Sequence, residues 1–246
     1  MTSTDGPSHH SVRVAADEAA EAATLPLYPI SLKVAGKACL VVGGGNVAAR
    51  KVAALVEAGA RVTVVAPELG EVLAEAAVTW RTSEEHPSWS WQAREFHDDD
   101  VAGCALVVAA TGDRAVNDSV AVAARRAGVL VNVVDDPERC DFFVPAVVTR
   151  GSLQIAVGTG GFAPGLAARL RARLEQEFPP AWGPAVAAVG AARRAVLSVD
   201  GLDEHARRQA LHDLGSLDLD ALLAEGGQAR VDTAVGEVVA RCTSRR

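Results

Sequence analysis

Short apolar runs alternate with segments of helical periodicity along the first half of this 246-residue chain. Four runs are rich in valine and show no polar alternation, which is typical of strands buried on both faces of a parallel sheet. They lie at residues 38–42, 61–66, 105–110 and 129–134. Helical patterns at 46–58 and 114–127 lie between them, and a glycine follows each. This order predicts an α/β fold with a Rossmann-type, doubly wound parallel sheet.

Two stretches depart from this alternation. Between the second and third runs, the pattern predicts a helix at 69–77, short strands at 78–81 and 93–96, a loop at 86–91, and an acidic turn or helix start at 98–100. After residue 137 it predicts strands at 142–148 and 153–157 and a helix at 164–178. Residues 182–246 contain only helical patterns, with glycines at their expected ends (201, 215 and 226–227).

These patterns predict four parts. Residues 1–24 are polar, rich in Ala and Glu and without a periodic apolar face, so we expect a flexible extension there. A Rossmann domain is expected at 25–137, a small α+β segment at 138–180 and a helical C-terminal domain at 181–246.

Composition and charge limit the class of protein. The formal net charge of −7 argues against nucleic acid or an anionic membrane as the main partner. No apolar run reaches membrane-spanning length, and the N-terminus lacks the pattern of a signal peptide, so a cytoplasmic location is expected. The four cysteines form no C-x-x-C pair, which disfavours a structural zinc site or a disulfide framework. We therefore expect no resident metal.

The first candidate site is the glycine turn that follows the first strand. Gly43, Gly44 and Gly45 precede the helical pattern that opens with Asn46 and Val47, in the order of the dinucleotide fingerprint G-x-G-x-x-(G/A). Gly43 permits the tight turn, Gly45 lets the backbone approach a pyrophosphate, and the free N–H groups of the helix start face the phosphates. A purely structural strand-to-helix turn is the alternative.

Two further pairs follow later strands. Glu68, or the backbone of Pro67 and Glu68, is the candidate for the cofactor ribose, and because no Arg follows that strand, NAD is favoured over NADP. Thr111 and Gly112 end the third strand, where doubly wound sheets bind ligands. Glu68 as a solvent-facing helix start, and Thr111-Gly112 as a simple turn capped by Asp113, are the alternatives.

The last strand and a second glycine cluster supply the remaining candidates. Asn132 and Asp135 lie in the run NVVDDP, where a carboxylate in a cleft can transfer protons, although Asp-Asp-Pro is also ordinary turn chemistry. A possible anion nest at 158–161 (with Thr159, Gly160 and Gly161) precedes a helix that carries Arg169. The alternative for this cluster is a flexible hinge before a charged helix face.

Several motifs together resemble one family. The chain is similar to the precorrin-2 dehydrogenase/sirohydrochlorin ferrochelatase family, the module that is fused to a methyltransferase in many bacterial siroheme synthases. The resemblance rests on Tyr28-Pro29-Ile30, VVGGGNVAARK (41–51), VTVVAPE (62–68), VVAATGD (107–113), NVVDDPERCDFFVPA (132–146) and IAVGTGGFAPGLAARLR (155–171). It covers residues 28 to about 180, and the methyltransferase part is absent.

The resemblance implies NAD-dependent oxidation of precorrin-2 to sirohydrochlorin and, in some members, insertion of Fe2+ to give siroheme. It implies that Asp135 is the catalytic proton acceptor, that Asn46-Val47 and Pro67-Glu68 contact the cofactor, and that the segment after the Rossmann domain builds a homodimer. The polycarboxylated substrate suits the glycine cluster and Arg169. A non-catalytic NAD(H)-sensing module is the alternative function, although it leaves NVVDDP and GTGGFAP without a purpose.

Overall fold

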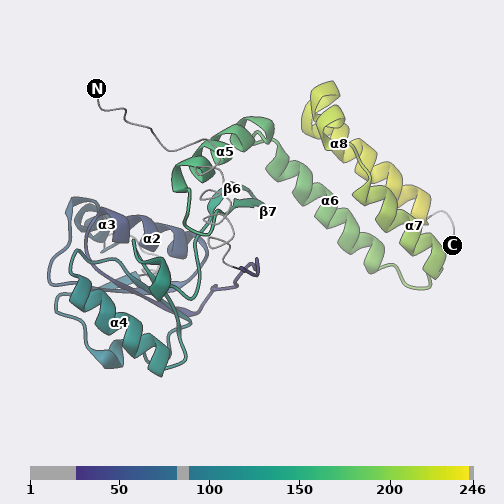
Figure 1. Ribbon diagram of the computed structural model, residues 1–246. Coiled ribbons are helices and arrows are strands. Elements are labelled where there is room, and N and C mark those ends of the chain that lie inside the picture. The colour runs from purple at the N-terminus through teal and green to yellow at the C-terminus, as the bar shows by residue number, and fades with distance from the viewer. Residues whose placement is uncertain (1–25, 82–88, 244–246) are drawn as a thin grey trace, which may run out of the picture. The chain divides into compact units, whose positions relative to one another are not determined.

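The computed structural model describes residues 26–81 and 89–243, and the chain divides into two compact units that meet between Val144 and Pro145 (Figure 1). The domain boundaries expected from the sequence lie at 137 and 180, and this finer division stays a prediction. The extension expected at 1–24 lies outside the described residues.

A five-stranded parallel sheet forms the centre of the first unit, in the order β3-β2-β1-β4-β5. Its strands are β1 (Ala38–Val42), β2 (Arg61–Val65), β3 (Trp89–Gln92), β4 (Leu106–Ala109) and β5 (Leu130–Val133). Its helices are α2 (Asn46–Glu57), α3 (Glu71–Arg81) and α4 (Arg114–Arg126), with two short 3-10 helices, η1 (Asp98–Val101) and η2 (Pro137–Arg139). The predicted doubly wound Rossmann sheet is confirmed.

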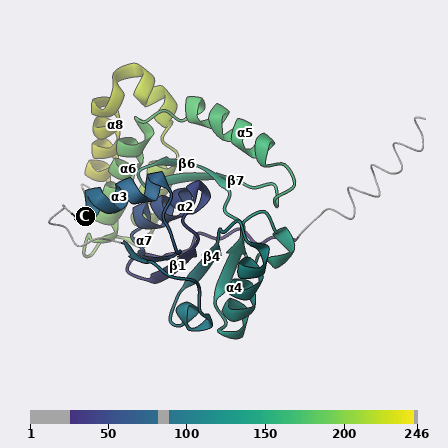
Figure 2. The same cartoon turned by 90° about the vertical axis from the view of Figure 1, so that its left-hand side faces the viewer.

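The two faces of this sheet are covered by different helices. Cys39 and Val41 of β1 belong to an apolar cluster that includes residues of α2 and α3, whereas Leu40 and Val42 belong to a cluster that includes α4. Figures 1 and 2 show α2 and α3 on one face and α4 on the other. Because both faces are buried, β1 and β4 are apolar throughout, and the inner positions of β2 and β5 are mostly valine.

The edge of the sheet at β3 differs from the prediction. Residues 78–81, expected as a strand, continue α3, and Val78 is 67% exposed, so no sheet stands beside it. The edge strand is instead Trp89–Gln92, which precedes the expected 93–96 and overlaps the expected loop at 89–91; residues 86–88 of that loop lie outside the described part. Trp89 is buried opposite Val62, and Trp91 Nε1 donates to Ala66 O at 2.9 Å. These contacts of the two indoles explain why Trp89–Gln92 forms the edge strand in place of the expected 78–81 and 93–96.

The second unit contains a hairpin and four helices. Its elements are β6 (Ala146–Arg150), β7 (Leu153–Val157), α5 (Pro164–Glu177), α6 (Trp182–Leu197), α7 (Glu204–Gly215) and α8 (Leu219–Thr243). The strand expected from residue 142 begins only at Ala146, since Pro145 has no N–H for a ladder and Phe142 O is bonded elsewhere.

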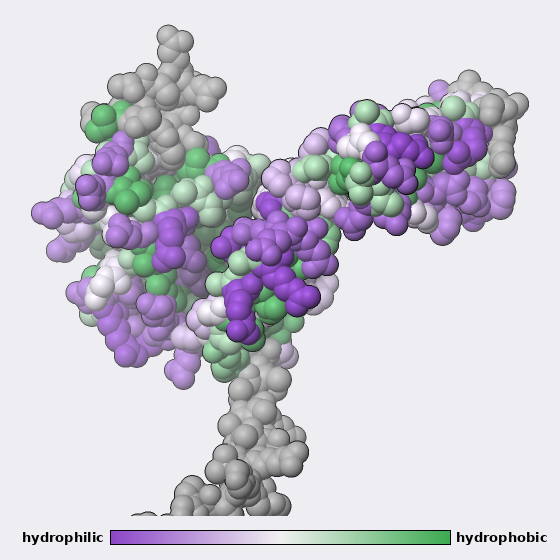
Figure 3. Space-filling model, turned by 90° about the horizontal axis from the view of Figure 1, so that it is seen from above, coloured by the Kyte–Doolittle hydropathy of each residue, from purple (hydrophilic) through white to green (hydrophobic). Residues whose placement is uncertain are grey.

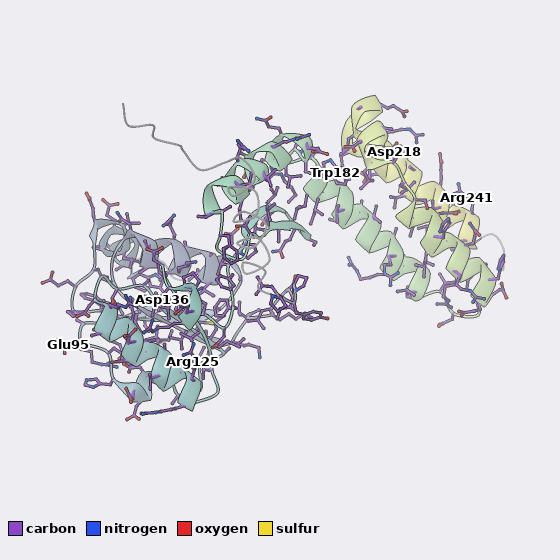
Figure 4. The ribbon with its side chains drawn as sticks, viewed as in Figure 1. Glu95, Arg125, Asp136, Trp182, Asp218 and Arg241 are labelled. Atoms are coloured by element: carbon purple, nitrogen blue, oxygen red, sulfur yellow. The ribbon has the colours of Figure 1, made fainter. Side chains whose placement is uncertain are left out.

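The three last helices share one apolar core. Ala185 and Val196 of α6 pack with Val231 and Val238 of α8 and with residues of α7. Figure 3 shows that the outward side of these helices, in the view from above, is mostly hydrophilic. Gly226 and Gly227, predicted at a helix end, have non-helical backbone angles and divide α8 into two helical segments, with φ of +60° at Gly227. Figure 4 labels Trp182 at the start of α6, and Asp218 and Arg241 towards opposite ends of α8. None of the described helices is long and apolar enough to span a bilayer.

The carboxylate of Asp100 fixes the chain before β4. It accepts hydrogen bonds from Arg94 at 2.5 and 2.8 Å and from the N–H of His97 at 2.9 Å, which closes η1. The hydrogen bond from Arg94 lowers the pKa of Asp100 from its ordinary 3.8, while partial burial opposes this. A lowered folded-state pKa gives stability that is complete above the unfolded pKa and is lost as the pH falls through the folded one.

We therefore expect Asp100→Asn to flatten the fall in unfolding free energy as the pH drops below about 4. Urea denaturation across that range measures this fall. The control is Asp99→Asn, at an exposed neighbour in η1, which should keep the wild-type slope. A wild-type slope in Asp100→Asn as well would contradict the assignment.

Candidate functional site

A cavity of about 480 Å³ opens at the carboxyl edge of the sheet, where β1, β4 and β5 end. It is lined by Gly45, Asn46 and Val47 after β1, by Ala110, Thr111 and Gly112 after β4, by Arg114 and Asn117 of α4, and by Val133, Val134, Asp135 and Asp136 after β5. The chain leaves the ends of β1 and β4 towards opposite faces of the sheet, and doubly wound folds bind their ligands at this switch point.

The structure brings six of the predicted site residues together in this lining: Gly45, Asn46, Val47, Thr111, Gly112 and Asp135. Five others in the first unit are outside it: Gly43, Gly44, Pro67, Glu68 and Asn132. Thr159, Gly160, Gly161 and Arg169 belong to the second unit. The functional roles given to all these residues stay predictions.

The first two glycines of the turn are required by the fold itself. A Cβ on Gly43, whose φ is +126°, would lie 2.4 Å from Ala110 O in the loop after β4. A Cβ on Gly44 would lie 2.1 Å from Glu68 O in the loop after β2. Both distances are far inside van der Waals contact with backbone atoms, which side chains cannot relieve by rotating. The loops after three strands therefore meet backbone to backbone at Gly43 and Gly44.

Gly45 differs from its neighbours because nothing in the described protein requires a glycine there. Its φ of −80° suits any residue, and a Cβ would have no atom within 4 Å. Gly45 also lines the cavity, so the missing side chain leaves space for a ligand to approach the backbone. This open cradle fits the pyrophosphate of a dinucleotide.

The adjacent helix start has the polarity that such a ligand needs. Gly45 is the N-cap of α2, and no side chain caps the free N–H groups of that helix. At α4, in contrast, Asp113 Oδ1 accepts from the N–H groups of Ala115 at 2.8 Å and Val116 at 3.4 Å. The start of α2, which no side chain caps, therefore offers its donors to an anion more openly than the start of α4.

The loop after β2 packs against the glycine turn from outside the cavity. Gly70 N donates to Gly44 O at 2.9 Å, and Glu68 O is the atom that excludes a side chain at Gly44. Pro67 and Glu68 are both exposed. This placement leaves the Glu68 carboxylate available beside the turn, as the ribose contact requires.

Thr111 and Asn117 interlock on the α4 side of the cavity. Thr111 Oγ1 donates to Asn117 Oδ1 at 2.8 Å, and Asn117 Nδ2 returns a hydrogen bond to Thr111 O at 3.1 Å. The simple-turn reading also has support, because Asp113 does cap the helix. Sequence reasoning missed Asn117, although a signal existed: it is a polar residue on the helix face of Val120 and Ala124, both fully buried.

Two adjacent carboxylates end β5 in different environments. Asp136 accepts from Arg139 Nη1 at 2.5 Å, and Arg114 Nη2 lies 3.9 Å from its carboxylate. Figure 4 labels Asp136 in the first unit. The Asp135 carboxylate is exposed, lines the cavity and has no hydrogen-bond or ion-pair partner among the described residues. Asp135 is also the only non-glycine residue in the described part of the chain with a positive φ, at 59°.

Asn132 has an internal role. It is 7% exposed, and its Nδ2 donates to Phe142 O at 2.9 Å and to Cys140 Sγ at 3.3 Å. The Asn132 amide, predicted to contact the substrate, thus donates its hydrogen bonds to the chain segment that follows η2.

The glycine cluster of the second unit closes on Thr159. Its hydroxyl accepts from Ala163 N at 3.2 Å, while Gly160 and Gly161 have φ of +60° and +86°. No side chain caps α5, which begins at Pro164. Arg169 is exposed, without a partner among the described residues. Both the anion nest and the hinge interpretation remain open.

In the described residues no group of three or more His, Cys, Asp or Glu side chains is arranged to hold a metal ion. The candidate chemistry of the cavity therefore consists of one open helix start, the Arg114 guanidinium and one unpaired carboxylate.

Comparisons with known proteins agree with this geometry. Residues 30–146 match a family described as putative NAD(P)-binding, and residues 150–177 match one described as sirohaem biosynthesis protein central. The chain is 44% identical to a siroheme synthase of Nitrosomonas eutropha over 63% of this chain and 32% of that protein. It is 41% identical to siroheme synthase 3 of Aeromonas hydrophila subsp. hydrophila over 82% of this chain and 42% of that protein. The chain thus spans less than half the length of either relative.

A solved structure has the same fold. This chain superposes on SirC, a precorrin-2 dehydrogenase, with a TM-score of 0.66, covering 86% of this chain and 98% of that chain at 21% sequence identity.

Two matched substitutions separate the structural from the ligand-binding glycines. We expect Gly45→Ala to leave the thermal midpoint within about 2 °C of wild type, because its Cβ meets nothing, yet to weaken NAD+ binding at least about tenfold. Gly44→Ala should instead destabilise the protein by about 1–3 kcal/mol, because the loop of Glu68 must move.

Thermal melts and titration calorimetry with NAD+ measure both variants. Wild-type NAD+ affinity in Gly45→Ala, or wild-type stability in Gly44→Ala, would refute this division of roles.

Proposed function

We propose that this chain oxidises precorrin-2 to sirohydrochlorin with NAD+, because it matches families described as putative NAD(P)-binding and sirohaem biosynthesis protein central and is similar to siroheme synthases. One observation carries the proposal: the open glycine cradle at Gly45 and the unpaired Asp135 carboxylate line the same cavity. Oxidation of this kind removes a hydride and a proton, which requires an acceptor for each. Bound NAD+ supplies the hydride acceptor.

Residues around the glycine turn would hold the cofactor. The N–H groups at the start of α2 face the phosphates, and Gly45 leaves the space for them. Glu68 offers a carboxylate to the ribose hydroxyls, and the loop from Ala66 to Gly70 contains no basic residue for a 2′-phosphate. This chemistry favours NAD over NADP.

Asp135 is the proposed proton acceptor. Its carboxylate is unpaired, whereas the charge of Asp136 is compensated by Arg139. An unpaired carboxylate keeps its lone pairs available for a substrate proton, which a paired one does not. Asp135 lies in the cavity lining beside Val134.

The substrate is a polycarboxylated tetrapyrrole, and Arg114 is the basic side chain in the cavity lining. Thr159, Gly160, Gly161 and Arg169 remain proposed substrate contacts from the second unit. Fe2+ is proposed as a second substrate, delivered to the product rather than held by a resident site. Comparing iron insertion into sirohydrochlorin with a protein-free control decides this point: faster insertion assigns the chelatase, and equal rates assign the dehydrogenase alone.

A homodimer is also part of the proposal, and an apolar stripe in the second unit supports it. Phe162, Leu166 and Leu170 recur every fourth residue at and along α5 and are 59%, 42% and 38% exposed. Such a stripe is typical of a helix that packs against another surface.

The activity is tested by following tetrapyrrole absorbance when protein, precorrin-2 and NAD+ are mixed. We expect NAD+-dependent oxidation, and a fall in kcat of about 10²–10⁴-fold in Asp135→Asn with NAD+ affinity unchanged, because the amide cannot accept the proton. Asp99→Asn, an exposed carboxylate in η1, is the control and should keep wild-type turnover. Intact NAD+ binding without oxidation would favour a sensing module, and undiminished turnover in Asp135→Asn would move the base elsewhere.

The dimer is tested by Leu166→Glu, which places a charge in the middle of the stripe. We expect sedimentation to show a monomer where wild type is a dimer, with unchanged helix content by circular dichroism. A wild-type sedimentation coefficient in this variant would exclude α5 from the interface.

A further inference from the structure

We propose that the thiol of Cys140 is a positioning group that holds Asp135 in its catalytic conformation. The inference rests on the proposed function, in which Asp135 accepts the substrate proton. It adds a residue outside the cavity lining that acts on the reaction only through the turn between β5 and η2.

Cys140 Sγ bonds to the backbone on both sides of Asp135. It lies 3.1 Å from Val133 O and 3.3 Å from Asp136 O, and its one S–H can be donated to either carbonyl. In the other direction it accepts the N–H of Val133 at 3.3 Å. The sulfur therefore connects the last residue of β5 with the residue that follows Asp135.

The thiol is itself held in place from β5. Asn132 Nδ2 donates to Cys140 Sγ at 3.3 Å and to Phe142 O at 2.9 Å. Between these two positions, Asp141 N donates to Val131 O at 2.8 Å, and Asp141 Oδ2 accepts from Val131 N at 3.0 Å. The segment that carries the thiol is thus bonded to three consecutive residues of the strand.

Asp135 needs such support because its backbone is strained. With φ at +59° it lies in the left-handed region, which costs a non-glycine residue free energy, although aspartate adopts it more readily than most. The hydrogen bond of the turn itself, from Asp136 N to Val133 O, is long at 3.3 Å. The thiol donates its one S–H to either of the carbonyls of these same two residues, while it accepts the N–H of Val133, and so restrains the turn.

The environment of the sulfur keeps it in the form that can donate. Burial raises the pKa of the Cys140 thiol, and the nearby carboxylates of Asp136 and Asp141 raise it further, against a lowering contribution from the Val133 backbone and from Lys51. The neutral thiol is therefore the form present at neutral pH, as donation to a carbonyl requires.

A double-mutant cycle tests the role on the full-length protein. The variants are Cys140→Ala, Cys140→Ser and Asp135→Asn, alone and with Cys140→Ala added to Asp135→Asn. Cys104→Ala is the matched control, since Cys104 is also half-buried but its Sγ faces Asp100 O at 3.6 Å, away from the turn. Precorrin-2 turnover, NAD+ affinity and amide hydrogen exchange at Val133 and Asp136 are measured on each.

We expect Cys140→Ala to lower kcat about 10- to 100-fold, as misplacement of a reacting group by about 1 Å does, with NAD+ affinity unchanged. Cys140→Ser should recover most of the loss, because a hydroxyl donates and accepts at the same place. In the Asp135→Asn background, Cys140→Ala should cost nothing further, because the group that it positions is already disabled. The amides of Val133 and Asp136 should exchange faster in Cys140→Ala and at the wild-type rate in Cys104→Ala.

Equal losses from Cys140→Ala in both backgrounds would overturn the positioning role, and so would wild-type kcat and exchange in that variant. If the wild-type protein does not oxidise precorrin-2, the proposed function fails separately. Amide exchange then decides alone whether the thiol restrains the turn.

Discussion

The site depends on the contact of three loops at the carboxyl edge of the sheet. Gly43 lies against Ala110 after β4, and Gly44 lies against Glu68 after β2, so close that neither position has room for a Cβ. This contact sets the distance between the end of β1 and its two neighbours, and hence the width of the cavity beside them. A binding site built on backbone contacts within a rigid sheet keeps its geometry better than one built on mobile side chains.

Within the part of the chain that the structure describes, two polar features stay without a partner at this edge: the N–H groups at the start of α2 and the carboxylate of Asp135. The start of α4 is closed by Asp113, whereas the start of α2 keeps its donors. Asp136 is bound by Arg139, whereas Asp135 has no partner among the described residues. The cavity thus combines a position for an anionic phosphate with a proton acceptor, and the fold keeps the two apart on the ends of β1 and β5.

Most of this could be predicted from the sequence because the signals were local. The valine-rich strands and the glycine turn each carry their own pattern, and the doubly wound sheet followed from them. Predictions failed where the outcome depended on distant contacts. The β-branched run at Val78 became helix because the sheet edge was occupied by Trp89–Gln92, whose indoles reach β2 and Ala66. Asn132 and Cys140 look like ordinary strand and turn residues, and only the folded chain shows them bonded to each other.

The central claim is that the cavity at the switch point is where dinucleotide and base meet. A crystal structure of the protein with NAD+ tests it most directly. The account predicts pyrophosphate density against the backbone of Gly45 and the N–H groups at the start of α2, with the nicotinamide in the cavity that Asp135 lines. A dinucleotide bound away from Gly45, or a nicotinamide outside that cavity, would contradict it.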